Sequence, residues 1–201
     1  MAIRTKFCLT SLLGLFIVIA VLSSGCSNQQ RTSGPATLNS SAGTTGWPEY
    51  SVDIIGLKFK YPSNWTFSPN INATNQLLSS KVSVTLAYIR PPCVECDAVV
   101  YVSTDKLPLG MTNEQYYNER KNYVKKYWNN QVEDLPVSTS GNNEFTGISY
   151  NYTIKGNTTP HNAREYMYVK NGTAVRIVYA AGIDVFNTYE SAFNSILSTF
   201  S

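Results

Sequence analysis

The sequence predicts an α+β protein in which an antiparallel β-sheet packs between and against α-helices. From residue 57 onward, most segments are short runs of β-branched and aromatic residues separated by turn residues, which is typical of antiparallel strands. Two segments, one that begins at Thr112 and one at residues 188–199, repeat their apolar residues at helical spacing instead. A strand-rich chain with one helix in its middle and one at its end predicts helices layered on a sheet.

The strand predictions rest on alternation and on turn residues. Residues 57–61 alternate apolar and cationic side chains, as a half-buried strand does, and Pro62 ends this run. A second short strand is expected at residues 65–67. Asn171-Gly172 is a strong type I′ turn signal and predicts a hairpin between the last two strands. The other expected strands are residues 81–89, 99–102, 132–138, 147–154, 164–169 and 174–179.

The two helices differ in character. Thr112 and Gln115 have the spacing of a capping box at the start of the first helix. We expect its tyrosines to lie half-buried against the sheet, with their hydroxyls at the rim. Arg120 and the lysines that follow it are expected on the solvated face, with contact to anionic lipid headgroups as the alternative. The apolar residues of the second helix face the core: Phe193, Ile196, Leu197 and Phe200.

The first 26 residues have the layout of a secretory signal. Arg4 and Lys6 precede an apolar run, and small residues stand directly before Cys26. This order predicts a lipoprotein leader over residues 1–26, with Cys26 as the lipidated first residue of the mature chain. Ser23 departs from the usual pattern, which has leucine at that place. An uncleaved membrane anchor and a plain secreted chain are the alternatives. The lipoprotein and the anchor place the body of the protein on the outer face of the cytoplasmic membrane, and all three export it.

The remaining chain divides into a tether and one folded domain. Residues 27–48 are rich in Ser, Thr, Gly and Asn and have too few large apolar residues to form a core, so they predict a flexible tether. Residues 49–201 are long enough for one domain. Without the two leader cations the chain is close to neutral, and no long cluster of Lys or Arg occurs. A nucleic-acid partner is therefore not expected.

Cys93 and Cys96 form the most suggestive short motif of the body. In an oxidising compartment the plain expectation is a local disulfide that closes a loop. A thioredoxin-type redox site would need a helix to begin at the pair, whereas prolines precede it and a β-rich segment follows. A zinc site would need two more ligands, and His161 is the one histidine of the chain. Disulfide, redox activity, metal binding and no bond thus remain as alternatives, in that order.

Other signatures of chemistry are missing from the sequence. His161 stands in a polar stretch that predicts a surface turn, and no nucleophile elbow, phosphate-binding loop or paired catalytic carboxylates accompany it. We therefore expect no catalytic residue, no metal site and no cofactor. Six sequons are candidate glycosylation sites, provided that the cell glycosylates exported proteins: Asn39, Asn64, Asn72, Asn151, Asn157 and Asn171.

The residues at the start of the body resemble a known family. Residues 56–65, GLKFKYPSNW, are similar to the opening of PsbP-like domains, the family of an extrinsic photosystem II subunit and its non-photosynthetic relatives. The segment from residue 164 onward resembles the closing part of that family. The resemblance implies an α/β/α sandwich, in which Tyr61 and Trp65 bracket a proline turn, and a habit of binding other proteins. It carries over no functional residues.

Together these observations predict a non-enzymatic, membrane-anchored extracytoplasmic domain. Its expected mode of action is contact with an as yet unknown protein partner, or an accessory role in an envelope complex. The first alternative is a lipoprotein that binds a small ligand or an ion, which requires a concave pocket with convergent polar groups. The second alternative is a thiol–disulfide redox protein that uses Cys93 and Cys96, which requires an exposed Cys93 with a depressed pKa.

Overall fold

The computed structural model describes residues 36–37, 42–79, 83–93, 96–128, 131–154 and 159–201. They belong to the second of two compact units, which spans Ser33–Ser201. The predicted leader, with Cys26, lies outside the described residues, as does most of the predicted tether. Among the helices described, none combines the length and the hydrophobicity needed to cross a membrane.

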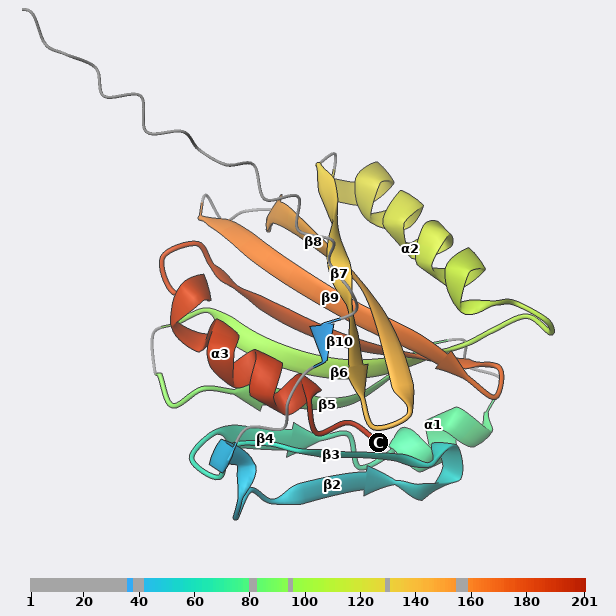
Figure 1. Cartoon of the computed structure of the whole chain (residues 1–201), viewed down its shortest axis with the longest axis horizontal. Coiled ribbons are helices and arrows are strands. Elements are labelled where there is room, and N and C mark those ends of the chain that lie inside the picture. The colour runs from blue at the N-terminus through green and yellow to red at the C-terminus, as the bar shows by residue number, and fades with distance from the viewer. Residues whose placement is uncertain (1–35, 38–41, 80–82, 94–95, 129–130, 155–158) are drawn as a thin grey trace, which may run out of the picture. The chain divides into compact units, whose positions relative to one another are not determined.

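An eight-stranded sheet forms the centre of this unit (Figure 1). Its strands lie in the order β1-β7-β8-β9-β10-β6-β5-β4, and all neighbours are antiparallel except β1 and β7. The strands are β1 (Ala36–Thr37), β4 (Thr66–Pro69), β5 (Ser83–Arg90), β6 (Ala98–Lys106), β7 (Val132–Ser140), β8 (Asn143–Thr153), β9 (Pro160–Lys170) and β10 (Thr173–Gly182). The predicted antiparallel α+β class is thus confirmed.

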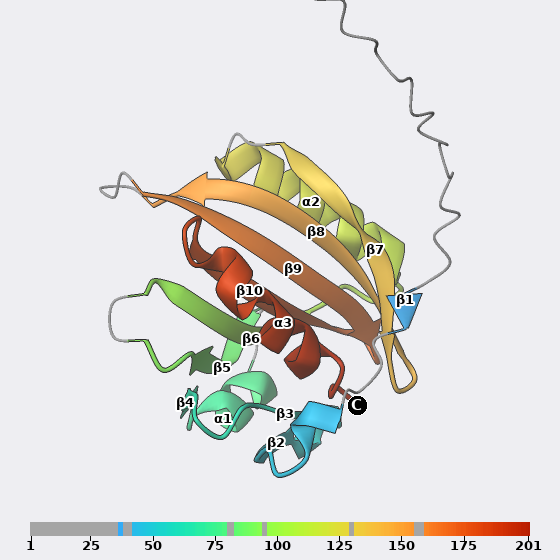
Figure 2. The ribbon, with the colours of Figure 1, turned by 60° about the vertical axis from the view of Figure 1, so that its left-hand side comes forward.

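Helices cover both faces of the sheet (Figure 2). Helix α2 (Asn113–Trp128) packs on β7, β8 and β9 on one face. Helix α3 (Phe186–Leu197) lies on the opposite face, against β10 and β6. A two-stranded hairpin and a short helix complete that second layer: β2 (Glu49–Val52), β3 (Leu57–Lys60) and α1 (Ala73–Leu78). The elements therefore form the predicted sandwich of helices around a sheet.

Two separate cores correspond to the two faces. The larger core lies under α3, where the fully buried Phe193 packs with Tyr179 of β10 at 5.3 Å between ring centroids. The smaller one lies under α2, where Val124 belongs to the same buried cluster as Ile148 and Met167. Strand β10 serves both cores because its successive side chains alternate between the faces.

Local sequence signals explain the turn between β9 and β10 and the start of α2. Asn171 and Gly172 have φ values of 52° and 72°, as both central positions of a type I′ turn require, and they join β9 to β10. The capping box at the start of α2 is also confirmed: the Thr112 amide donates to Gln115 Oε1 at 2.9 Å, and the Gln115 amide donates to Thr112 Oγ1 at 3.2 Å. These reciprocal bonds fix where α2 begins.

The structure corrects several expected boundaries. Strands β6, β8, β9 and β10 all extend beyond the predicted segments, because ladder pairing continues through polar residues once a neighbouring strand is present. Helix α3 begins at Phe186 rather than at residue 188. Strand β2 and helix α1 were not predicted, because both are short and lack clear periodicity. Such elements form because tertiary neighbours stabilise them, and Ala73 of α1 accordingly belongs to the larger core.

Candidate functional site

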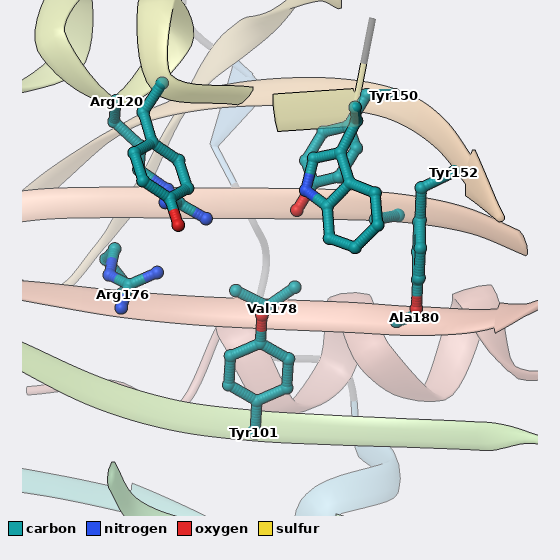
Figure 3. A pocket seen from close by; sticks show the side chains of 10 residues that line it. Tyr101, Arg120, Tyr150, Tyr152, Arg176, Val178 and Ala180 are labelled. Carbon is teal, nitrogen blue, oxygen red and sulfur yellow. The ribbon is translucent and has the colours of Figure 1, made fainter. Parts of the chain in front are cut away.

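The face of the sheet under α2 is only partly covered. Most contacts of helix α2 are with β7, β8 and β9, whereas its Tyr116 reaches Asp105 of β6. A pocket of about 290 Å³ lies at the border of the covered part. Its lining comes from α2 and from four strands (Figure 3): Tyr101, Arg120, Tyr123, Trp128, Tyr150, Tyr152, Ala163, Arg176, Val178 and Ala180.

Strand register explains why the surface is hollow here. Ala163 of β9 pairs with Ala180 of β10 and, on its other side, with Tyr150 of β8. Two methyl side chains therefore stand side by side where the neighbouring rows carry large groups. One row away, Val178 pairs with Tyr101 of β6, whose ring forms a wall of the pocket. The hollow is thus a consequence of two small residues in adjacent strands.

Aromatic side chains enclose one end of the pocket. The ring of Trp128, at the end of α2, lies 5.0 Å from that of Tyr152, measured between centroids. Tyr150 and Tyr152, two residues apart on β8, have centroids 6.1 Å apart. In Figure 3 the Tyr152 ring is seen edge-on, with one of its faces turned toward Val178. This end therefore presents π-faces, which attract cations and flat apolar groups.

A buried ion cluster forms the opposite end. Glu165 of β9 is 0% exposed and accepts two bonds from Arg120, at 2.6 Å from Nε and 3.1 Å from Nη2. Arg176 Nη1 approaches the same carboxylate at 3.5 Å, and the Tyr150 hydroxyl donates to it at 3.3 Å. A fully buried carboxylate is stable only when paired and hydrogen-bonded, and these three partners supply both conditions.

A second carboxylate continues the cluster along the sheet. Asp105 of β6 contacts the Tyr116 hydroxyl, and its Oδ2 lies 3.0 Å from Arg176 Nε. That contact is an ion pair but not an aligned hydrogen bond, because Arg176 Nε has no hydrogen-bond partner within the described part of the chain. The cluster thus holds two cations and two anions, and it joins α2 to three strands.

Burial and charge keep the pocket tyrosines in their neutral form. Burial raises the pKa of Tyr101 to about 12, and the Glu165 carboxylate acts in the same direction. The pKa of Tyr150 is raised by the same two causes. Burial alone would lower the pKa of the Arg120 guanidinium, but the Glu165 carboxylate outweighs it and raises that pKa. At neutral pH the pocket therefore contains phenol hydroxyls beside permanently charged guanidinium groups.

The tyrosines and cations of α2 lie partly elsewhere than predicted. Half-buried rings were expected for Tyr116, Tyr123 and Tyr127. Tyr123, at 47% exposed, fits this expectation, whereas Tyr116 is buried more deeply and Tyr127 is 61% exposed. The expected solvated position of Arg120 is also wrong, because its side chain turns toward Glu165. The one sequence signal for this pair was a lone glutamate in the apolar β9 segment, which only a buried cation could balance.

His161 is a second correction. It lies in β9 and is 1% exposed, not in a surface turn as predicted. Its Nε2 lies 2.5 Å from Asp97 Oδ2, and its Nδ1 lies 3.0 Å from the Thr159 carbonyl oxygen. Its ring also packs on Tyr152, with centroids 5.2 Å apart. The polar flanking residues hid a strand that pairs on both sides and that buries His161, Ala163 and all of residues 165–168.

Cys93 and Cys96 lie in the loop that joins β5 to β6, and both are partly buried. They are present as two thiols, with the Cys96 amide 3.0 Å from the Cys93 sulfur. Burial is the largest cause that raises the pKa of the Cys96 thiol, and its hydrogen bond to Cys93 adds to this. A raised pKa lowers the thiolate fraction of Cys96, whereas the redox alternative depends on Cys93 and stays a prediction.

For the two cysteines we predict a disulfide in the exported protein. The peptide that contains both, isolated without reduction after alkylation, should be unlabelled and lack the two thiol hydrogens. The same peptide from a reduced sample, as the control, should take up two labels. Because the loop is very short, loss of the bridge through Cys93→Ser should change the free energy of unfolding by less than the 2–4 kcal/mol typical of long-loop disulfides. Two labels without reduction would contradict the bridge.

The remaining predicted sites are the six candidate glycosylation asparagines. Four of the six candidate asparagines are described and solvent-exposed: Asn64, Asn72, Asn151 and Asn171. Asn39 and Asn157 lie outside the described residues. No group of three or more His, Cys, Asp or Glu side chains suited to a metal ion occurs in the ranges that the structure describes. Glycosylation of these sites stays a prediction.

Comparison with known proteins shows which solved structures share this fold. No protein-family model matches the sequence, and no curated protein matches it. Among solved structures, the chain is similar to cyanobacterial PsbP (CyanoP) from Synechocystis sp. PCC 6803, with a TM-score of 0.50 and 18% identity over 80% of this chain and 96% of that one. It is also similar to LpqN of Mycobacterium tuberculosis, with a TM-score of 0.51 and 12% identity over 84% and 88% of the two chains. LpqN is described as involved in cell envelope biogenesis. The resemblance that the opening motif indicates is thus confirmed at the level of the fold, and this chain has the fold of PsbP-like proteins.

Proposed function

We propose that this protein is a non-catalytic, exported accessory domain of the cell envelope, and that the pocket beside α2 is its binding site. The observation that carries the proposal is the pocket itself, where aromatic faces and buried charged groups meet over the two small residues Ala163 and Ala180. Ligand pockets are typically concave, mostly apolar and supplied with a few convergent polar groups. The small-ligand alternative requires such a pocket, and we therefore rank it above protein contact for this site.

The chemistry of the pocket favours binding over catalysis. Its charged groups Arg120 and Glu165 are committed to each other in a two-bond ion pair, which leaves neither poised to transfer a proton. Tyr101 and Tyr150 have raised pKa values, which makes them poor bases at neutral pH. Groups arranged in this way can orient a bound molecule, and neither of the two structural neighbours is described as an enzyme.

Membrane attachment is the second part of the proposal. The leader, with Cys26, and a tether over residues 27–48 would hold the folded domain near the outer face of the cytoplasmic membrane. A cell-envelope neighbour of the same fold, LpqN, supports an exported location. Intact-mass measurement of the protein extracted from its own membranes tests the anchor: a lipid-sized increment on a chain that begins at Cys26 is expected, and an unmodified Cys26 would refute it.

Native mass spectrometry tests the pocket. We expect protein released from its own membranes in mild detergent to carry a small-molecule adduct that is lost in Tyr101→Ala. The matched control is Tyr127→Ala, because Tyr127 is 61% exposed and does not line the pocket. Both variants should keep the wild-type circular dichroism spectrum. If wild type, Tyr101→Ala and Tyr127→Ala behave alike, the pocket is not the binding site.

A different surface favours contact with a protein as a second candidate function. Exposed aliphatic side chains surround a hollow of about 600 Å³ between the β2–β3 hairpin and the loop that precedes α2. Ile54 is 45% exposed and Leu109 is fully exposed there, beside Leu107 and Met111. Contiguous exposed apolar residues often mark protein contacts. Crosslinking of the membrane-bound protein should capture a partner whose recovery falls in Leu109→Asp, and equal recovery would reject this surface.

A further inference from the structure

The pocket is polarised along the strands. On β10, Arg176, Val178 and Ala180 follow one another on the same face, so the strand runs from the ion cluster to the aromatic end. Figure 3 shows Arg120 and Arg176 together at one end and Tyr152 at the other, with Val178 between them. Beyond Tyr152 the next charged group is Asp97, which contacts His161 and whose charge contributes to the raised pKa of Tyr152 after burial. Cationic and aromatic groups thus occupy opposite ends of one hollow.

Hydrogen-bond donors remain unused at the cationic end. Arg120 binds Glu165 through Nε and Nη2, and Arg176 faces carboxylates through Nε and Nη1. Each guanidinium therefore keeps one terminal nitrogen outside these pairs. Arg176 Nε is buried and has no hydrogen-bond partner within the described ranges. Buried donors without an acceptor are unfavourable, so this end is suited to an anionic oxygen from a ligand.

The aromatic end has a different requirement. Its walls are ring faces of Trp128, Tyr150 and Tyr152, and its floor consists of the methyl groups of Ala163 and Ala180. A primary ammonium group would need several hydrogen-bond acceptors, and among these three side chains only the two tyrosine hydroxyls can accept. A quaternary ammonium group has no N–H to satisfy and is attracted to ring faces. Trp128, the best of the aromatic partners for such a cation, is part of this wall.

We propose that the pocket binds a small zwitterion in which a quaternary ammonium group lies a few bonds from a carboxylate or phosphate. This inference rests on the proposed function and names its ligand class. The ammonium lies among Trp128, Tyr150 and Tyr152, and the anionic group reaches Arg176. The different chemistry of the two ends of the pocket fixes the orientation of the ligand. With a carboxylate as the anionic group the net charge of the ligand is zero, which matches a cluster in which the two cations are already balanced by two carboxylates.

Isothermal titration calorimetry with matched probes tests the charge pattern. Glycine betaine carries both groups, tert-butylacetate replaces its quaternary nitrogen by carbon, and choline replaces its carboxylate by a hydroxyl group. Phosphocholine distinguishes a phosphate from a carboxylate as the anionic group. We expect at least one of the two zwitterions to bind about tenfold more tightly than either choline or tert-butylacetate. Equal affinity for tert-butylacetate and glycine betaine would show that the quaternary charge is not recognised and would overturn the proposal.

Two variants test which group of the ligand lies at each end of the pocket. Trp128→Leu should weaken binding of the zwitterion by about tenfold, whereas Tyr127→Leu, its neighbour on α2, should leave the affinity within about twofold of wild type. Arg176→Lys keeps a positive charge beside Glu165 and Asp105 but removes the guanidinium nitrogens, so it should weaken binding of the zwitterion but not of choline. If none of the four probes binds although the native adduct disappears in Tyr101→Ala, the ligand class is wrong and the pocket stands. If the adduct is absent as well, the proposed function itself fails.

Discussion

Replacement of Glu165 by leucine is expected to lower the free energy of unfolding by about 3–5 kcal/mol, because it leaves two guanidinium groups buried without their shared carboxylate. The side chains of Arg120 and Arg176 are 15% and 11% exposed, so water can replace the lost partner only in part. Arg176 keeps its ion pair with Asp105, but Arg120 loses both of its hydrogen bonds to Glu165. Urea denaturation followed by far-ultraviolet circular dichroism measures this effect.

Three further variants separate charge from shape at this position. Glu165→Gln keeps the volume and one acceptor and should be less destabilising than Glu165→Leu. The double variant Glu165→Leu/Arg120→Met removes both members of the pair and should recover part of the loss, because apolar pairs of similar volume often replace buried ion pairs. Glu144→Gln, on the exposed side of β8, should change stability by less than about 0.5 kcal/mol. A Glu165→Leu protein as stable as wild type would show that the cluster does not hold α2 to the sheet.

The class of fold could be predicted from the sequence because its signals are local. Alternation, turn dipeptides and a capping box each act within a few residues, and the hairpin at Asn171-Gly172 and the start of α2 at Thr112 follow from them directly. The length of β9 could not be predicted in this way. His161 and Asn162 are polar, and only pairing with β8 and β10 makes them part of a strand.

The candidate site was missed because its residues come together only through strand order. Tyr101 and Val178 are 77 positions apart in the printed sequence, yet they stand opposite each other in the ladder between β6 and β10. No spacing rule links Arg120 on a helix to Glu165 on a distant strand. The alanines that create the hollow have no chemical signature at all. The sequence could therefore indicate a binding domain of this fold, while the position of its pocket required the register.

Replacement of Phe200 by alanine is expected to lower the free energy of unfolding by about 3–5 kcal/mol, a loss typical of a large buried aromatic residue. Phe200 is 1% exposed and stacks on Phe59 of β3 with 4.7 Å between centroids. Two hydrogen bonds join the next residue to the same strand: Lys58 donates to the Ser201 carbonyl and Ser201 to the Lys58 carbonyl, both at 3.0 Å. The chain end therefore acts as an additional strand-like partner of β3.

Hydrogen exchange distinguishes a local effect of Phe200→Ala from a global one. If the chain end holds the β2–β3 hairpin to the larger core, the Lys58 amide should lose protection to a greater extent than amides at the centre of β10, such as Ile177. Phe200→Leu keeps most of the buried apolar area and should retain protection at both sites. Ile71→Ala, at a side chain that is 89% exposed, is the control and should change stability by less than about 0.5 kcal/mol. Equal loss at Lys58 and Ile177 would mean that the hairpin and the sheet unfold as one unit. Unchanged exchange at both would show that Phe200 does not anchor the hairpin, because a 4.7 Å ring stack that stabilises β3 must slow its opening.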